Sequence, residues 1–190
     1  MEKKIEKQRF YISDFREEET WLAFMQSEGW RFICTDGHKY EFHKSEKEDW
    51  TYQLDFKEDG IATDDYIQLY SDYGWEYVFK FRKWFYFRKI KIEGTKEDLS
   101  IFSDNESKIS MYKRVMNGYI YLLLPLYICM FVYDYFVFFT TVFKGNGFLN
   151  IFIYGAAIGA MIVVCFGFGF LIGQYSKLNK MIKNLENPLK

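Results

Sequence analysis

Two long apolar runs dominate the C-terminal part of the chain. Residues 118–143 contain one charged side chain, Asp134, and residues 148–175 contain none. A helix rises about 1.5 Å per residue, so about 20 apolar residues cross the hydrocarbon core of a bilayer. Both runs therefore predict membrane-spanning helices. We expect a two-helix transmembrane hairpin with an external turn at residues 144–147.

Basic residues flank this hairpin at its two outer ends. Lys108, Lys113 and Arg114 precede the first run, and Lys177, Lys180 and Lys183 follow the second, whereas the turn contains only Lys144. Short segments rich in Lys and Arg remain on the cytoplasmic side of a membrane. We therefore expect a multi-pass protein of the cell membrane, with two spans and with its N- and C-termini in the cytoplasm.

The polar N-terminal part contains an internal repeat. The segment Glu19 to Lys44 aligns without a gap with the segment Asp64 to Lys89, at an offset of 45 residues. Gly29-Trp30 matches Gly74-Trp75 identically, and aromatic or aliphatic positions match around them. Self-similarity at a fixed offset indicates a duplicated structural unit.

Each copy has the pattern of a strand, a helix and two further strands. The helices follow Asp14 and Thr63, which are suitable N-caps, and Gly29 and Gly74 end them as left-handed caps. Glu17, Glu18 and Glu19 are interpreted as first-turn carboxylates that favour the helix dipole. The expected strands are residues 9–13, 30–35 and 38–44 in the first copy, and 50–56, 75–81 and 84–89 in the second.

The predicted fold class is therefore α+β: a tandem βαββ duplication forming an antiparallel sheet with two helices, followed by the transmembrane hairpin. A capping box of Ser103 and Glu106 should begin a helix that enters the membrane. The expected domains are a cytoplasmic duplicated domain at 1–92, a linker and juxtamembrane helix at 93–117, spans at 118–143 and 148–175, the turn at 144–147, and a basic tail at 176–190.

Charge and cysteine content agree with this division. The 190 residues include 25 Lys+Arg and 26 Asp+Glu, but residues 1–117 hold 20 and 24 of these and residues 118–190 hold 5 and 2. The acidic N-terminal part does not favour nucleic acid, which needs a cationic excess. The three cysteines give no disulfide framework, as expected for a cytoplasmic domain.

Aromatic side chains are the main candidate binding groups. They make up 22% of the chain, and both faces of the hairpin at residues 75–89 carry them. Such a sheet either buries both faces in a core or offers one face to a partner. The candidate ligand-binding residues, for a planar apolar small molecule, are Tyr40, Phe42, Trp84 and Tyr86.

No metal or catalytic centre is expected. Cys34, Asp36, His38 and His43 lie around one hairpin, but they lack a second ligand pair at metal-binding spacing. Phosphate-binding loops, nucleophile elbows, dinucleotide fingerprints and HExxH motifs are missing from the sequence. We therefore expect a protein that is not an enzyme and needs no cofactor.

Two features of the apolar runs suggest further contacts. Small residues let helix backbones approach closely, so Gly155, Gly159, Gly169 and Gly173 are candidate helix-packing positions, against the first span or against another subunit. Asp134 has a tyrosine on each side and is interpreted as a water-exposed residue at the outer membrane boundary, with a proton or substrate site as the alternative.

The N-terminal part also resembles a known family. The run D-F-x-E-E-E-x-W-L-x-x-M-x-x-x-G-W, from Asp14 to Trp30, is similar to the start of a bacterial family of unknown function. In that family, a Trp- and Tyr-rich cytoplasmic domain often precedes membrane helices. The segments Tyr73 to Val78 and Trp84 to Lys89 continue the match. Members are often encoded beside PadR-type regulators, so the resemblance implies induced expression.

These observations favour a membrane-anchored, non-catalytic ligand-sensing or regulatory module, related to stress or antimicrobials. The alternative is an accessory subunit that docks on a membrane complex through its transmembrane helices. The expected partners are membrane lipid, a planar apolar small molecule, and a membrane protein or a second copy of the chain.

Overall fold

The computed structural model describes residues 2–91, 100–102, 104–143 and 148–187, apart from some side chains in the two long helices. The chain divides into two compact units. The first contains residues up to Val115 and the C-terminal end from Ile182, and the second runs from Met116 to Met181. The mixed α+β class is as predicted.

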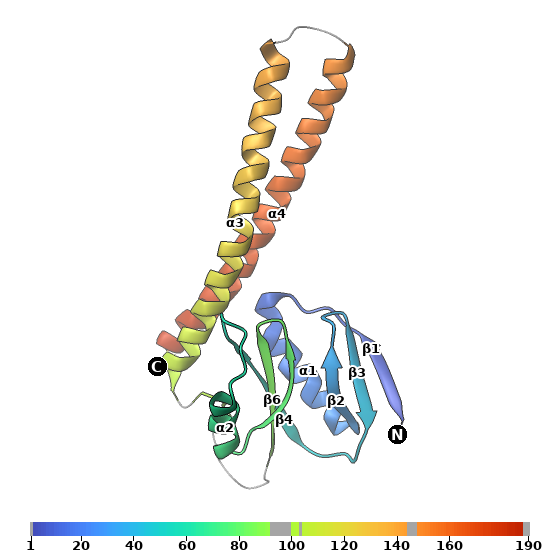
Figure 1. Cartoon of the computed structure of the whole chain (residues 1–190), viewed down its shortest axis with the longest axis vertical. Coiled ribbons are helices and arrows are strands. Elements are labelled where there is room, and N and C mark those ends of the chain that lie inside the picture. Colours follow the sequence, from blue (N-terminus) through green and yellow to red (C-terminus); the bar gives the residue numbers. More distant parts are fainter. Residues whose placement is uncertain (1, 92–99, 103, 144–147, 188–190) are drawn as a thin grey trace. The chain divides into compact units, whose positions relative to one another are not determined.

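The first unit contains two small antiparallel sheets (Figure 1). In the first sheet, β3 lies between β1 and β2, and in the second, β6 lies between β4 and β5. The strands are β1 (Lys3–Lys7), β2 (Trp30–Thr35), β3 (Lys39–Lys44), β4 (Trp50–Phe56), β5 (Glu76–Phe81) and β6 (Trp84–Ile90). Helix α1 (Phe15–Ser27) follows β1 after a 3-10 turn at Ile12–Asp14, and α2 (Asp64–Asp72) follows β4.

The two halves share fine details of backbone geometry. Both hairpins contain a register shift, between Phe32 and Cys34 in the first sheet and between Tyr77 and Phe79 in the second. The skipped positions, Ile33 and Val78, lie 45 residues apart, which is the offset of the sequence repeat. Gly29 (φ 84°) and Gly74 (φ 79°) both adopt the left-handed conformation after their helices, as predicted.

Two details of the predicted sheet are wrong. The first leading strand is β1 at Lys3–Lys7, not residues 9–13; it is a charged edge strand without apolar alternation, so the hydrophobic pattern gives no signal for it. The strands also form two sheets, not one. The edges β2 and β5 lie near each other without a hydrogen-bonded ladder, and Phe32 and Phe79 meet there with ring centroids 6.3 Å apart.

Helices cover both faces of the second sheet. Tyr66 and Tyr70 of α2 pack on Phe87 of β6, with centroid separations of 5.9 and 4.5 Å. On the other face, Trp84 of β6 contacts Phe15 of α1 at 5.4 Å. The aromatic residues on the two faces of β6 therefore form a core around the strand.

The second unit is built from two long helices that lie side by side in Figure 1. They belong to α3 (Asn105–Phe143) and α4 (Phe148–Glu186), each of 39 residues. Only one described helix segment, Ile158–Glu186 of α4, is long and apolar enough to cross a membrane; the apolar stretch found in α3, Tyr127–Thr140, is shorter. The turn expected at 144–147 lies outside the described residues.

The start of α3 differs from the predicted capping box. Ser103 lies outside the described residues, and α3 begins at Asn105. Asp104 occupies the capping position, since its Oδ1 accepts a hydrogen bond of 2.7 Å from the backbone N–H of Ser107. A carboxylate at this position also favours the helix dipole. The helix then continues without a break from the first unit into the second.

Candidate functional site

The N-terminal half of α1 carries two buried carboxylates. Glu18 is 6% exposed and its Oε1 accepts hydrogen bonds from the Tyr40 hydroxyl at 2.8 Å and from the Tyr86 hydroxyl at 2.7 Å. Tyr40 belongs to the first sheet and Tyr86 to the second. Glu18 therefore joins the two halves of the domain through one oxygen atom.

Glu19 binds a different set of groups. Its Oε1 accepts a 2.8 Å hydrogen bond from the backbone N–H of Leu54 in β4, and its Oε2 accepts one of 3.0 Å from Nη1 of Arg16. Arg16 also donates from Nε and Nη2 to the hydroxyl of Tyr112, at 3.0 and 2.7 Å. Tyr112 lies in the first part of α3 and is buried. A chain of hydrogen-bonded polar groups thus connects β4, α1 and α3.

A second polar contact reaches α3 from the second half of the domain. Asp55 of β4 is 2% exposed, and its Oδ2 accepts hydrogen bonds from the hydroxyls of Tyr66 and Tyr70 at 2.8 and 3.2 Å. Its other oxygen pairs with Nη2 of Arg114 at 3.4 Å. Arg114 also donates from Nε to the carbonyl of Phe56 at 3.2 Å. Helix α3 is therefore attached to both halves.

Burial changes the proton affinity of both glutamates. Burial raises the pKa of Glu19 to about 7, against the opposing effects of the Arg16 charge and the Leu54 N–H. Burial also raises the pKa of Glu18, although hydrogen bonds from Tyr86 and Tyr40 oppose this shift. The network therefore contains carboxyl groups that bind protons more readily than an exposed glutamate.

We call Arg16, Glu18, Glu19, Asp55, Tyr112 and Arg114 the carboxylate network. Both oxygens of Glu19 and of Asp55, and one oxygen of Glu18, are engaged by protein donors, so these carboxylates connect secondary-structure elements. Among the described residues, no group of three or more His, Cys, Asp or Glu side chains could hold a metal ion.

The structure brings the four predicted ligand-binding residues into the interior. Tyr40, Phe42 and Tyr86 are buried and Trp84 is half-buried. Tyr40 and Tyr86 meet at Glu18, and Phe42 packs against Trp21 of α1 with centroids 5.5 Å apart. Tyr40, Phe42 and Tyr86 therefore form part of the buried core, and Trp84 lies at its edge. The binding of a planar molecule by these residues stays a prediction.

The predicted helix-packing glycines and Asp134 have different surroundings. A Cβ atom added at Gly155, Gly159, Gly169 or Gly173 would meet no described atom within 4 Å. It is Gly167 that faces α3, since its missing side chain leaves room for the Tyr127 hydroxyl. Asp134 is 3% exposed, so the structure buries it, where we expected a water-exposed position.

Sequence reasoning missed the network that attaches α3. It assigned the first-turn glutamates to helix capping, because a run of three carboxylates before an apolar stretch has that pattern. The available signal was the spacing of Glu18 from Phe15 and Leu22, which places it on the buried face of α1. No signal in the sequence pairs Arg16 with Tyr112, which lies 96 residues later.

The comparison with protein families finds a match. A family described as "Protein of unknown function (DUF2812)" covers residues 14–124. Neither the comparison with curated proteins nor that with solved structures finds a match. The matched segment includes α1, both hairpins and the first part of α3, and so contains every member of the carboxylate network. The chain belongs to this family of proteins of unknown function.

Proposed function

We propose that the chain is a membrane-anchored, non-catalytic regulatory module. Its N-terminal α+β domain lies in the cytoplasm, and α3 passes changes in that domain to the membrane helices. The observation that carries the proposal is the double attachment of α3: Tyr112 binds Arg16 of α1, and Arg114 binds Asp55 of β4. The same helix continues into the second unit without a break.

Membrane anchoring is supported by one long apolar segment and by exposed apolar side chains. Ile158–Glu186 is long and apolar enough to span a bilayer. Large apolar residues are exposed on both long helices, among them Phe131, Phe136, Val163 and Phe166. Such surfaces are unfavourable in water and suited to lipid. We propose that α3 also spans the membrane, so that both termini face the cytoplasm.

The input to the module is proposed to act on α1. Glu18 and Glu19 tie α1 to both sheets, so a ligand or protonation event that moves α1 also moves Arg16 and its partner Tyr112. A planar apolar molecule that opens the aromatic core beside α1 is one such input. Induced expression beside a PadR-type regulator, in response to stress or an antimicrobial, belongs to the same proposal.

A comparison of exchange rates along α3 tests this transmission. In the full chain in lipid nanodiscs, the variant Tyr112→Phe/Arg114→Gln should raise hydrogen exchange of the backbone amides at residues 105–115 at least about tenfold, because each lost charge-assisted contact contributes about 1–2 kcal/mol. The increase should extend into residues 116–124. Lys113→Gln is the matched control, since Lys113 lies between the two positions and is exposed.

An increase in hydrogen exchange that is confined to the start of α3 would contradict the proposal. If exchange rises at residues 105–115 and stays unchanged at 116–124, the contacts fix the start of α3 and transmit nothing along it. If Lys113→Gln produces the same pattern as the double variant, the effect does not come from the network.

A second candidate function is an accessory subunit of a membrane complex. The observation that favours it is the open surface at Gly155, Gly159, Gly169 and Gly173. Among the described residues, no atom of α3 lies within 4 Å of a Cβ placed at these positions. Replacement of Gly159 and Gly173 by leucine should release a bound membrane partner, because close helix packing needs small residues. An unchanged set of proteins that co-purify with the variant in mild detergent would exclude this role.

A further inference from the structure

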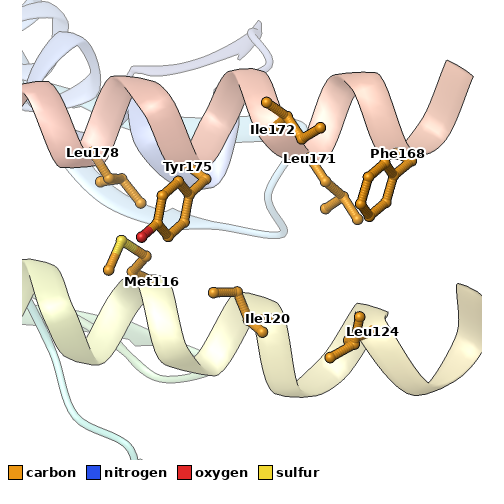
Figure 2. A pocket seen from close by; sticks show the side chains of 8 residues that line it. All are labelled: Met116, Ile120, Leu124, Phe168, Leu171, Ile172, Tyr175 and Leu178. Carbon is orange, nitrogen blue, oxygen red and sulfur yellow. The ribbon is translucent and has the colours of Figure 1, made fainter.

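An apolar groove runs between the two long helices within the second unit (Figure 2). Its volume is about 150 Å³. Met116, Ile120 and Leu124 line it from α3, at four-residue spacing that places them on one face of that helix. Phe168, Ile172 and Tyr175 are among the residues that line it from α4. We call this the α3–α4 groove.

The groove has an elongated shape that suits a hydrocarbon chain. The lining residues of α3 extend over eight positions, which is about 12 Å along a helix. The lining is apolar except for the hydroxyl of Tyr175, whose ring projects from α4 toward Met116 in Figure 2. Water does not fill a site with so few polar partners, and an unfilled groove loses dispersion contacts on both helices.

The groove does not enclose a helix. A helix with its side chains is about 10 Å across, so a helical segment could lie over the groove but not within its volume of about 150 Å³. A single alkyl chain is much thinner and can follow the groove along its length. A linear apolar chain is therefore the class of ligand that fits.

Polar groups toward one end of the groove indicate which kind of molecule the apolar chain belongs to. Tyr175 offers one O–H donor, and the ester carbonyl of a phospholipid is an acceptor that has no donor of its own. Lys177 and Lys180 follow Tyr175 on α4 within two turns, and cations at this level attract anionic headgroups. An acyl chain in the groove would place its ester near Tyr175 and its phosphate at the level of these lysines along the helix axis.

We propose that the α3–α4 groove binds one acyl chain of an anionic membrane phospholipid, with the Tyr175 hydroxyl donating to the ester carbonyl. The site rests on the membrane location given under the proposed function and adds a ligand to it. The lipid packs against the part of α3 that follows the carboxylate network. It is therefore a structural ligand of the helix pair and not a substrate.

Native mass spectrometry of the full chain tests the site. The protein is reconstituted in phosphatidylcholine–phosphatidylglycerol bilayers, extracted in mild detergent, and measured for retained phospholipid. Ile172→Trp fills the groove. Ile162→Trp is the matched control, because Ile162 lies on the same helix, is 52% exposed against 51% for Ile172, and does not line the groove.

The wild-type chain and Ile162→Trp should retain one phosphatidylglycerol per chain, and Ile172→Trp should retain at least about tenfold less. Leu124→Trp, which fills the groove from α3, should act like Ile172→Trp. Tyr175→Phe should weaken retention of ester-linked lipid severalfold and leave retention of an ether-linked analogue unchanged, because the ether lacks the carbonyl acceptor.

Equal retention by Ile172→Trp and Ile162→Trp would overturn the proposal, as would a wild-type chain that retains no lipid or only a free fatty acid. Alkaline carbonate extraction of the same membranes separates this failure from failure of the proposed function. A chain that stays in the membrane but retains no phospholipid contradicts the groove alone. A chain released by carbonate contradicts membrane anchoring.

Discussion

At the scale of single residues, the fold depends on charged groups placed inside an aromatic core. Glu18 and Glu19 are adjacent in sequence and both 6% exposed, yet they bind different elements. Glu18 joins β3 to β6 through two tyrosine hydroxyls, and Glu19 joins α1 to β4. A buried polar group that loses its partner is more costly than one that is never buried. These two residues therefore should be sensitive to substitution.

Glu18→Ala should lower the free energy of unfolding by about 2–4 kcal/mol, because it leaves the hydroxyls of Tyr40 and Tyr86 buried without their acceptor. Glu18→Gln keeps an acceptor oxygen and should cost less than about 1 kcal/mol. All five tryptophans lie before residue 85, so urea unfolding followed by tryptophan fluorescence reports on this domain in the full chain. Equal losses for the two variants would show that the hydrogen bonds are not the cause.

Glu19 should make domain stability depend on pH. Its pKa is raised from 4.5 to about 7 by burial, so the folded domain holds the proton more tightly than the unfolded chain. This contribution to stability is fully present below pH 4.5 and is lost as the pH rises through about 7. The shift corresponds to about 3 kcal/mol.

Glu19→Gln should flatten this pH dependence, since the amide does not titrate and still offers an acceptor to the Leu54 N–H. Two ionisable groups face Glu19. Arg16 stays charged, and Glu18 has a pKa that is raised in the same direction, so the stability of the Glu19→Gln variant should keep a smaller dependence on pH. Urea unfolding of both chains across this pH range measures the difference. A wild-type stability that rises with pH through this range would contradict the assignment.

At the scale of secondary-structure elements, the repeat is present in both halves but the halves are not equivalent. Helix α1 has six buried residues and contacts both sheets, while the shorter α2 has none fully buried. The matching bulges at Ile33 and Val78 show that the hairpins are similar in detail. The difference lies in the second sheet, where α1 covers the face that α2 leaves free.

Substitution of Trp30 and of Trp75 measures how differently the two halves are packed, because these residues occupy matching positions in the repeat. Trp75 is 4% exposed, so Trp75→Ala should cost about 3–5 kcal/mol of unfolding free energy. Trp30 is half-buried and lies beneath the ammonium groups of Lys4 and Lys44, so Trp30→Ala should cost about 1 kcal/mol. Fluorescence of the four remaining tryptophans follows unfolding. Equal costs would contradict the unequal packing.

Local patterns in the sequence were sufficient for most elements of the domain. Alternating aromatics located β4 and β6, and Gly29 and Gly74 located the helix ends, because these signals are local. The strand β1 could not be located, since Lys3–Lys7 pairs through its backbone and has no apolar face. The site was missed for a related reason: its contacts join α1 and β4 to α3, and they depend on packing between distant segments.

At the scale of the whole molecule, the two units of the chain differ in the residues that they expose. The polar first unit carries the carboxylate network, and the second unit exposes apolar residues along both helices. If both helices cross a bilayer, both ends lie on one side of it, and the cations before the apolar part of α3 and after that of α4 favour the cytoplasmic side. The central claim is that the domain faces the cytoplasm and that α3 and α4 anchor it.

Thiol labelling in whole cells tests this claim most directly. Single cysteines replace Lys144, Ser45 or Asn187 in a chain whose native Cys34, Cys129 and Cys165 have been removed, and a membrane-impermeant reagent is added to intact or permeabilised cells. In intact cells, only the cysteine at position 144 should react, and permeabilisation should expose the other two. Labelling of positions 45 and 187 in intact cells, or protection of position 144, would contradict the account.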